Sequence, residues 1–297
     1  MDTPDELYTL RAQYYLGHYT LSLEEAKAIS RRPLSNDLKI EREEFQLRAM
    51  LALKQYDKVI DAASDLSAGT KAIGVRAKYD SPSTPESSKA NLLSELQALA
   101  SDPSTTATAQ LIAAQTFLSQ GEMTKEALQC VHAGATMEHL ALSVQIYLRM
   151  DRLDLAKQTL NKMKQADEEA VLTQLCNCHV AIYTGSSQAL DAVHIVGSMS
   201  EQYGACVMLL NLVAVAYMAA GQYAEAESSL IDATAEGEDV DTLINLVVCY
   251  QHQGKAAEIG QVLGTIKNSY PNHSFVQGLL RVEGAFERES VKYKVAA

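Results

Sequence analysis

The stretch "MAAGQYAEAESSLI" at residues 218–231 decides the fold, and "CYQHQGKAAEIGQVL" at residues 249–263 repeats its pattern. Each stretch places a glycine between two apolar, alanine-rich segments, Gly221 in the first and Gly254 in the second. We therefore take each glycine as position 15 of a repeating unit of about 34 residues.

The residues around these glycines follow the tetratricopeptide pattern of a helix, a tight turn, a second helix and a break. Ala214 at position 8 and Ala226 at position 20 allow the two helices to approach closely. Tyr217 and Leu230, at positions 11 and 24, fill the space between the helices. Glycine at position 15 frees the turn from the φ restriction that a side chain would impose.

The same pattern recurs upstream, so we expect turns between paired helices at seven positions. These positions are Gly17, residue 54, Gly121, Asp151, Gly185, Gly221 and Gly254. One further unit fits between residues 54 and 121, with its helices in "TKAIGVRAKYD" and "KANLLSELQALA". Residues 80–88, "DSPSTPESS", join these two helices and are too polar and proline-rich to be helical.

Helix pairs of this kind cannot each bury an apolar face alone, and stacked neighbours share one continuous core. We therefore expect an all-α fold, a tetratricopeptide-like α-solenoid that forms a single domain over residues 1–297. It should contain about eight helix pairs. A capping helix should follow them near residues 274–290.

Composition and charge argue against several classes of protein. The formal net charge is −12 and the only adjacent basic pair is Arg31-Arg32, so we expect no nucleic-acid partner. No apolar run approaches the roughly 18 residues that span a bilayer, and the acidic N-terminal segment does not resemble a signal peptide. We therefore expect a cytosolic protein without direct membrane insertion. The five cysteines lie in helical stretches, where they serve as small apolar side chains rather than as a disulfide framework.

The densest set of possible metal ligands is "CNCH", which contains Cys176, Cys178 and His179. Residues i and i+2 of a helix point about 200° apart, so the two thiols cannot reach one metal ion. The seven histidines lie in no catalytic frame, and no GxSxG, HExxH or phosphate-loop motif is present. We expect no enzymatic activity, no cofactor and no bound metal.

The inner, concave face of the solenoid is the candidate binding surface. Tetratricopeptide domains that clamp a peptide carboxylate use lysine, asparagine and arginine at positions 2, 5, 6 and 9, but no cation occupies these positions around Gly221 and Gly254. An apolar strip with methionines instead suits a hydrophobic partner segment, although some of its residues could simply touch the neighbouring helix. The candidate partner-binding residues are Met208, Asn211, Val215, Met218, Ile244, Val248 and Gln251.

The segment "VQIYLRMDRLDLAKQTLNKMKQADEEAVLTQL" at residues 144–175 resembles the epsilon subunit family of coatomer, the COPI vesicle coat. Its most specific part is "DRLDLAK" followed by "DEEAVLTQL", because this part departs from a generic repeat. Other segments resemble the family in the same order: "RAQYYLGHY", "EREEFQLRAMLAL", "GATMEHLALSVQI", "LLNLVAVAYMAAGQYAEAESSLIDA" and "TLINLVVCYQHQGK".

The resemblance implies a non-enzymatic coat subunit that binds the C-terminal region of the coatomer alpha subunit, and through it the rest of coatomer. It also implies recruitment by an ADP-ribosylation factor GTPase to the cytosolic face of Golgi membranes and COPI-coated vesicles. The expected role is Golgi-to-ER retrograde and intra-Golgi vesicle transport. The alternative is another cytosolic tetratricopeptide adaptor, such as a co-chaperone scaffold, and an enzyme is the third option.

Overall fold

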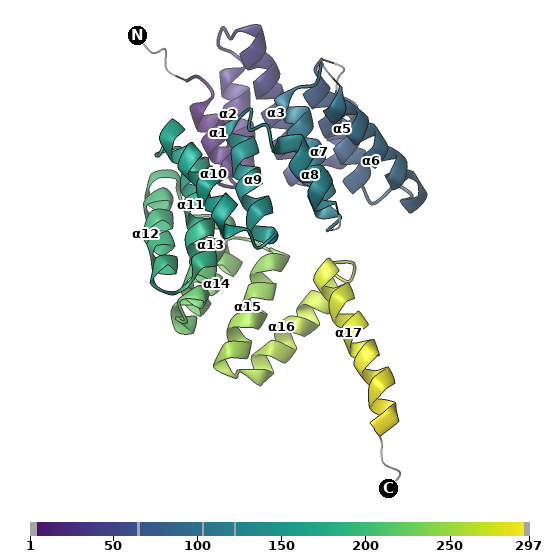
Figure 1. Ribbon diagram of the computed structural model, residues 1–297, viewed down its shortest axis with the longest axis vertical. Helices are drawn as coiled ribbons and strands as arrows, with labels where there is room; N and C mark the ends of the chain where they lie inside the picture. Colours follow the sequence, from purple (N-terminus) through teal and green to yellow (C-terminus); the bar gives the residue numbers. More distant parts are fainter. Residues whose placement is uncertain (1–4, 64–65, 103, 122, 294–297) are drawn as a thin grey trace.

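Helices account for all regular structure in residues 5–63, 66–102, 104–121 and 123–293, which the computed structural model describes. Figure 1 shows the helices stacked side by side along a curved path, so the expected all-α architecture is confirmed. The helices of this part are, pair by pair, α1 (Tyr8–Tyr15) and α2 (Tyr19–Ile29), α3 (Asn36–Ala52) and α4 (Tyr56–Ala62), α5 (Ala68–Asp80) and α6 (Glu86–Ser101), α7 (Ala107–Ser119) and α8 (Thr124–Val131), α9 (Met137–Arg149) and α10 (Leu153–Ala166), α11 (Val171–Thr184) and α12 (Ser186–Tyr203), α13 (Val207–Ala219) and α14 (Tyr223–Glu236), α15 (Val240–Gln253) and α16 (Ala256–Ser269), and then α17 (Ser274–Ser290) with a short 3-10 helix at Val291–Tyr293.

In every helix pair except α5–α6, the turn is set by one residue with a positive φ. All seven expected turn positions have it, and Gly221, with φ of 78°, is typical. After α13 the Gln222 N–H donates to the Tyr217 carbonyl at 2.9 Å, which closes the helix end in the arrangement that favours glycine. Lys54 and Asp151 adopt the same backbone at φ of 58° and 57° without being glycine. Their side chains therefore strain these two turns.

The connection between α5 and α6 is shorter than the sequence indicated. We expected residues 80–88 to be non-helical, but α5 ends at Asp80 and α6 begins at Glu86. The prediction was wrong for Asp80, which is the last residue of α5, and for residues 86–88, because Pro85 stands just before the first turn of α6 and does not interrupt it. Proline is tolerated there, since the first N–H groups of a helix have no intrahelical partner.

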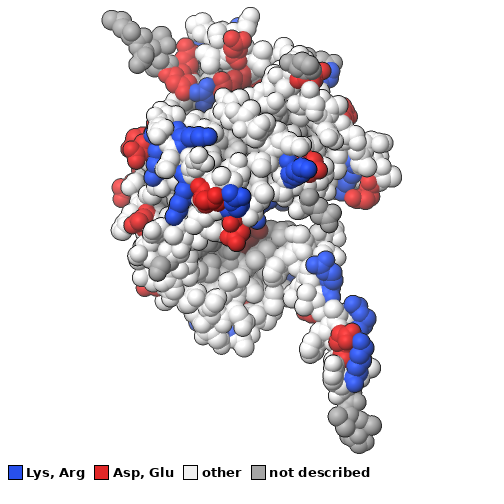
Figure 2. Space-filling model, in the orientation of Figure 1, with Lys and Arg blue, Asp and Glu red and all other residues white. Residues whose placement is uncertain are grey.

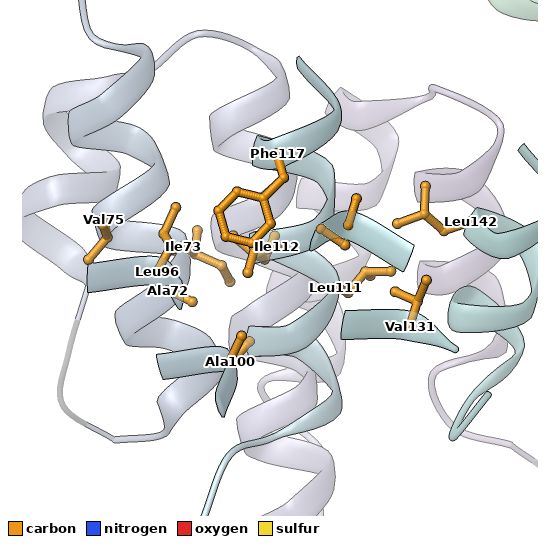
Figure 3. Close-up of a cluster of buried hydrophobic side chains, with 14 of the residues drawn as sticks. Ala72, Ile73, Val75, Leu96, Ala100, Leu111, Ile112, Phe117, Val131 and Leu142 are labelled. Carbon is orange, nitrogen blue, oxygen red and sulfur yellow. The ribbon is translucent and has the colours of Figure 1, made fainter. Parts of the chain in front are cut away.

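The core runs along the stack as a series of clusters between neighbouring pairs. Figure 3 shows the cluster around Phe117 of α7, which lies against Ile73 of α5 and Leu96 of α6. These three side chains are almost fully buried. Alanines at intervening positions allow the helix axes to approach closely enough for the large side chains to interdigitate.

The first helix pair returns to contact the sixth and seventh pairs, and the repeat pattern did not predict this. Ala12 and Leu16 of α1 belong to the same buried cluster as Leu175 of α11 and Leu209 of α13. The Cys206 thiol donates to the Leu16 carbonyl at 2.9 Å across this contact. The curved stack therefore closes on itself, and α1 lies beside the inner helices α11 and α13.

A buried ion pair joins the second pair to the fifth. The Arg48 guanidinium of α3, 3% exposed, donates to both carboxylate oxygens of Glu138 on α9, one of them at 3.2 Å. It also lies over the rings of Tyr14 and Phe45, 4.6 and 4.7 Å from their centroids. Three elements, α1, α3 and α9, are held together by this one side chain.

The last helix, α17, occupies Ser274–Ser290 and projects away from the stack in Figure 1. Val276 is the one residue of α17 that is buried. Leu280 is 48% exposed and Phe286 is 74% exposed. An ion pair between Lys267 of α16 and Glu283 of α17 joins the two helices at 3.0 Å, and Figure 2 shows charges of both signs along the projecting end. In this arrangement α17 covers little of the preceding pair.

Replacement of Arg48 tests the buried ion pair. We expect Arg48→Met to lower the free energy of unfolding by about 3–5 kcal/mol, because it leaves the Glu138 carboxylate without its partner. The double variant Arg48→Met/Glu138→Leu should recover much of this loss. Urea unfolding followed by circular dichroism measures the free energy of unfolding of both variants. The exposed ion pair Lys292–Glu289 is the control, and Lys292→Met should change this free energy by less than about 1 kcal/mol. An Arg48→Met protein as stable as wild type would contradict the prediction.

Replacement of Lys54 tests the strained turns. We expect Lys54→Gly to raise the free energy of unfolding by about 0.5–1 kcal/mol, because glycine adopts a positive φ without strain. Gly221→Ala should lower it by about 1 kcal/mol for the same reason. A Cβ at residue 221 would meet no atom within 4 Å, so its cost comes from the backbone alone. Thermal unfolding of the two variants should shift the midpoint in opposite directions.

Candidate interaction groove

The first helices of the fifth, sixth and seventh pairs line an apolar cavity of about 500 Å³. This cavity and a second one that adjoins it form a groove, and we call the first cavity the apolar end of the groove. Its floor is formed by α9, α11 and α13, and Tyr15 of α1 stands at its edge. The closure of the stack brings Tyr15 to this position. Figure 2 shows a hollow between the upper helices and α15 below, with few charged side chains on its floor.

The cavity is lined by the concave positions of successive repeats. In the unit with Gly185 at position 15, positions 2, 5, 6, 9 and 12 are Leu172, Leu175, Cys176, His179 and Ile182, all of which line the cavity. The sequence analysis applied these positions to the α13 and α15 units only and therefore missed the α11 residues. These α11 residues could have been identified from the sequence by counting repeat positions from Gly185. No signal in the repeat pointed to Tyr15, because it comes from a helix far away in the sequence.

The structure divides the seven residues proposed for the concave strip. Met208, Asn211 and Val215 come together at the apolar end. Met218 packs into the cluster between α13, α14 and α15, and it is therefore part of the internal packing of these helices. The other three lie on α15: Ile244 is half-buried, Val248 is 42% exposed and Gln251 is exposed.

The amide of Asn211 is engaged within the chain. Its Nδ2 donates to the Val207 carbonyl at 2.9 Å and to the Thr242 hydroxyl at 2.6 Å. Its Oδ1 accepts a hydrogen bond from Asn245 Nδ2 at 2.9 Å. Asn211 therefore fixes α13 against α15. Met208 is half-buried and packs partly against the cluster of α1, α11 and α13, whereas the half-buried Val215 offers apolar surface to the cavity.

A second cavity of about 750 Å³ adjoins the first, and Met208 and Asn211 line both. We call it the acidic end, because Glu236, Glu238, Asp239 and Asp241 line it together with a single lysine, Lys54. Asp239 accepts hydrogen bonds from the backbone and hydroxyl of Thr242, at 3.0 Å each, and so caps α15. The other three carboxylates are exposed and form no ion pair within the described ranges.

The thiols of "CNCH" diverge, as their spacing predicts. Cys176 Sγ lies 3.9 Å from the Ala141 carbonyl of α9, whereas Cys178 Sγ lies 3.9 Å from the Ala192 carbonyl of α12. Burial raises the pKa of both thiols to about 12. Among the residues that the structure describes, no three His, Cys, Asp or Glu side chains gather as metal ligands would.

His179 sits at the apolar end with its ring largely buried. Its Nδ1 has no hydrogen-bond partner among the described residues. Burial lowers the pKa of the His179 imidazole, since the charged form would lose its hydration. The same cause lowers the pKa of His139, which is buried in α9.

None of the helices in the described ranges is both long and apolar enough to span a bilayer.

Comparison with known proteins agrees with the repeat pattern and the resemblance. The sequence profile of the family described as coatomer epsilon subunit matches residues 3–294. Coatomer subunit epsilon-1 of Arabidopsis thaliana is 35% identical over 292 residues, 97% of each chain. Coatomer subunit epsilon-1 of Oryza sativa subsp. japonica is 36% identical over 293 residues, covering 97% of this chain and 98% of the relative. The epsilon subunit of Caenorhabditis elegans is 27% identical over 288 residues, covering 96% and 97%.

Solved structures support the solenoid fold. A tetratricopeptide repeat protein from Parabacteroides merdae ATCC 43184 superposes with a TM-score of 0.52 at 14% identity, covering 93% of this chain and 96% of that one. A chain of the APC/C hetero-tetramer Cut9-Hcn1 superposes with a TM-score of 0.59 at 15% identity, covering 91% and 54%. At these identities the likeness concerns the fold alone, and it confirms the tetratricopeptide-like architecture.

The buried histidines predict a pH-dependent stability. Their folded pKa lies below the unfolded value of about 6.5, so the unfolded chain binds more protons as the pH falls through that value. We expect the free energy of unfolding to decrease between about pH 7 and about pH 5, by at most ~1.4 kcal/mol per pH unit for each histidine. His179→Gln should reduce this pH dependence in urea unfolding, and the exposed His132→Gln serves as control. An unchanged pH dependence in His179→Gln would contradict the assignment.

Proposed function

Since the chain belongs to the coatomer epsilon subunit family and is thus a structural subunit of the COPI coat, we propose that it binds and stabilises the C-terminal region of the coatomer alpha subunit. The binding surface would be the inner side of the solenoid, at the apolar end of the groove. Coat subunits of this family partner with other coatomer subunits. We specify here which subunit is bound, and which face of the solenoid binds it.

The apolar end is the observation that carries the proposal. It is open, is lined mainly by apolar side chains of three successive inner helices, and has Val215 and Leu212 half-buried at its floor. Exposed apolar surface of this kind commonly marks a protein interface. Burial of one such side chain contributes about 1.5–3 kcal/mol, so a few of them supply much of the energy of a stable contact.

The same proposal places the protein in Golgi-to-ER retrograde and intra-Golgi transport. It would act on the cytosolic face of Golgi membranes and COPI-coated vesicles, where an ADP-ribosylation factor GTPase would recruit the whole coat. We propose a non-enzymatic role. The raised pKa of the two buried thiols supports this role, because a protonated, buried thiol is a poor nucleophile near neutral pH.

Substitution at the groove tests the proposed partner. We expect Val215→Asp to weaken binding of the full chain to a purified alpha C-terminal fragment by tenfold or more, about 1.4 kcal/mol or more, because an unpaired charge would enter an apolar contact. Isothermal titration calorimetry measures the Kd, and circular dichroism verifies that helicity is intact. Met218→Asp is unsuitable, since Met218 belongs to the internal packing.

Ile231→Asp is the matched control for the groove variant. Ile231 is an exposed aliphatic residue of α14, the second helix of its pair, and does not line the apolar end. We expect this variant to bind the alpha fragment as wild type does. Wild-type affinity in a folded Val215→Asp protein would show that the alpha subunit uses another face.

A further inference from the structure

We propose that the groove binds an extended peptide segment of the partner in which an apolar side chain is followed or preceded, a few residues away, by a lysine or arginine. The apolar side chain would enter the apolar end, and the basic side chain would be bound by Glu236, Glu238 and Asp241 at the acidic end. This inference rests on the proposed function, since it specifies the chemistry of the segment that occupies the same groove.

The two ends of the groove call for two kinds of side chain. They are continuous, because Met208 and Asn211 line both cavities. Four carboxylates and one lysine line the acidic end, which leaves an excess of three negative charges. Glu236, Glu238 and Asp241 have no ion-pair partner in the described part of the chain. A cationic side chain would complement these free carboxylates.

The spacing of the two side chains follows from the geometry of α13. Met208 lies at the boundary between the two ends and Val215 lies seven residues further along the helix, at the apolar end. At 1.5 Å per residue, the apolar end extends about 10 Å along α13. An extended peptide covers this length with about three residues. The basic residue should therefore lie roughly three to five residues from the apolar one.

His179 provides an independent sign that the apolar end receives a polypeptide backbone. Neither ring nitrogen forms a hydrogen bond with a described residue, and Nδ1 is fully buried. A buried N–H without an acceptor is more costly than a buried lone pair, so the proton belongs on Nε2. Nε2 is the accessible nitrogen of a side chain that lines the cavity. It can donate a hydrogen bond to a backbone carbonyl of the bound segment, as polar groups in apolar clefts commonly do.

Charge-neutralising substitutions at the acidic end test the proposal. The variant Glu238→Gln/Asp241→Asn leaves the capping residue Asp239 in place and changes exposed side chains only. With the purified alpha C-terminal fragment as probe, we expect its Kd to rise roughly three- to tenfold at low salt. The dependence of Kd on salt concentration should also decrease, because exposed charge pairs are screened by salt.

Lys54→Asn gives the opposite change at the same cavity. Asparagine tolerates the positive φ of residue 54 and removes the single cation that would repel a basic segment. We expect it to tighten binding of the alpha fragment. Glu238→Lys should weaken binding further, and reversal of one lysine or arginine of the fragment to glutamate should restore it, which would identify the bound residue.

The outcomes separate this inference from the proposed function. If Val215→Asp weakens binding but Glu238→Gln/Asp241→Asn leaves both the Kd and its salt dependence unchanged, the alpha subunit binds in the groove without a basic side chain and this inference is wrong. If neither variant affects binding, the proposed function of the groove is wrong as well. Tighter binding of Glu238→Gln/Asp241→Asn would also overturn the inference.

Discussion

The buried contact of Arg48 with Glu138 is the constraint on which the shape of the molecule depends. A solenoid of stacked pairs fixes only the relation of each pair to its neighbour. Arg48 reaches from the second pair to the fifth and is enclosed by the rings of Tyr14 and Phe45. The aromatic rings exclude water from the guanidinium, and the Glu138 carboxylate supplies the opposite charge. The two buried charges therefore neutralise each other only when the stack is curved enough to bring α3 to α9.

The curvature produces the groove. Once α1 lies against α11 and α13, the inner helices face a bounded cavity instead of an open sheet of helices, and Tyr15 forms one of its edges. The end of α3 and the start of α15 then meet at a second cavity, where Lys54 stands among the carboxylates of the α14–α15 connection. Residues from both halves of the chain form each cavity, so the proposed binding surface depends on the closure.

The two ends of the groove differ in a way that suits a coat subunit. In the proposed binding mode, the apolar end would provide affinity by removing apolar surface from water, whereas the acidic end would provide selection by repelling acidic segments and attracting basic ones. The projecting helix α17 carries separate apolar surface at Leu280 and Phe286, outside the groove. Separate apolar surfaces of this kind suit a structural coat subunit, because each can contact a different chain.

The sequence by itself determined the elements that depend on local chemistry. The seven turns, including those at Lys54 and Asp151, and the divergence of Cys176 and Cys178 follow from offsets along one or two helices. The concave positions of α11 could also have been obtained from the repeat phase. Only the tertiary structure decided the return of α1, the contact of Arg48 with Glu138, and the separation of Met218 from Met208 and Val215. These features depend on the sum of small rotations over several pairs, and a local pattern contains no information about that sum.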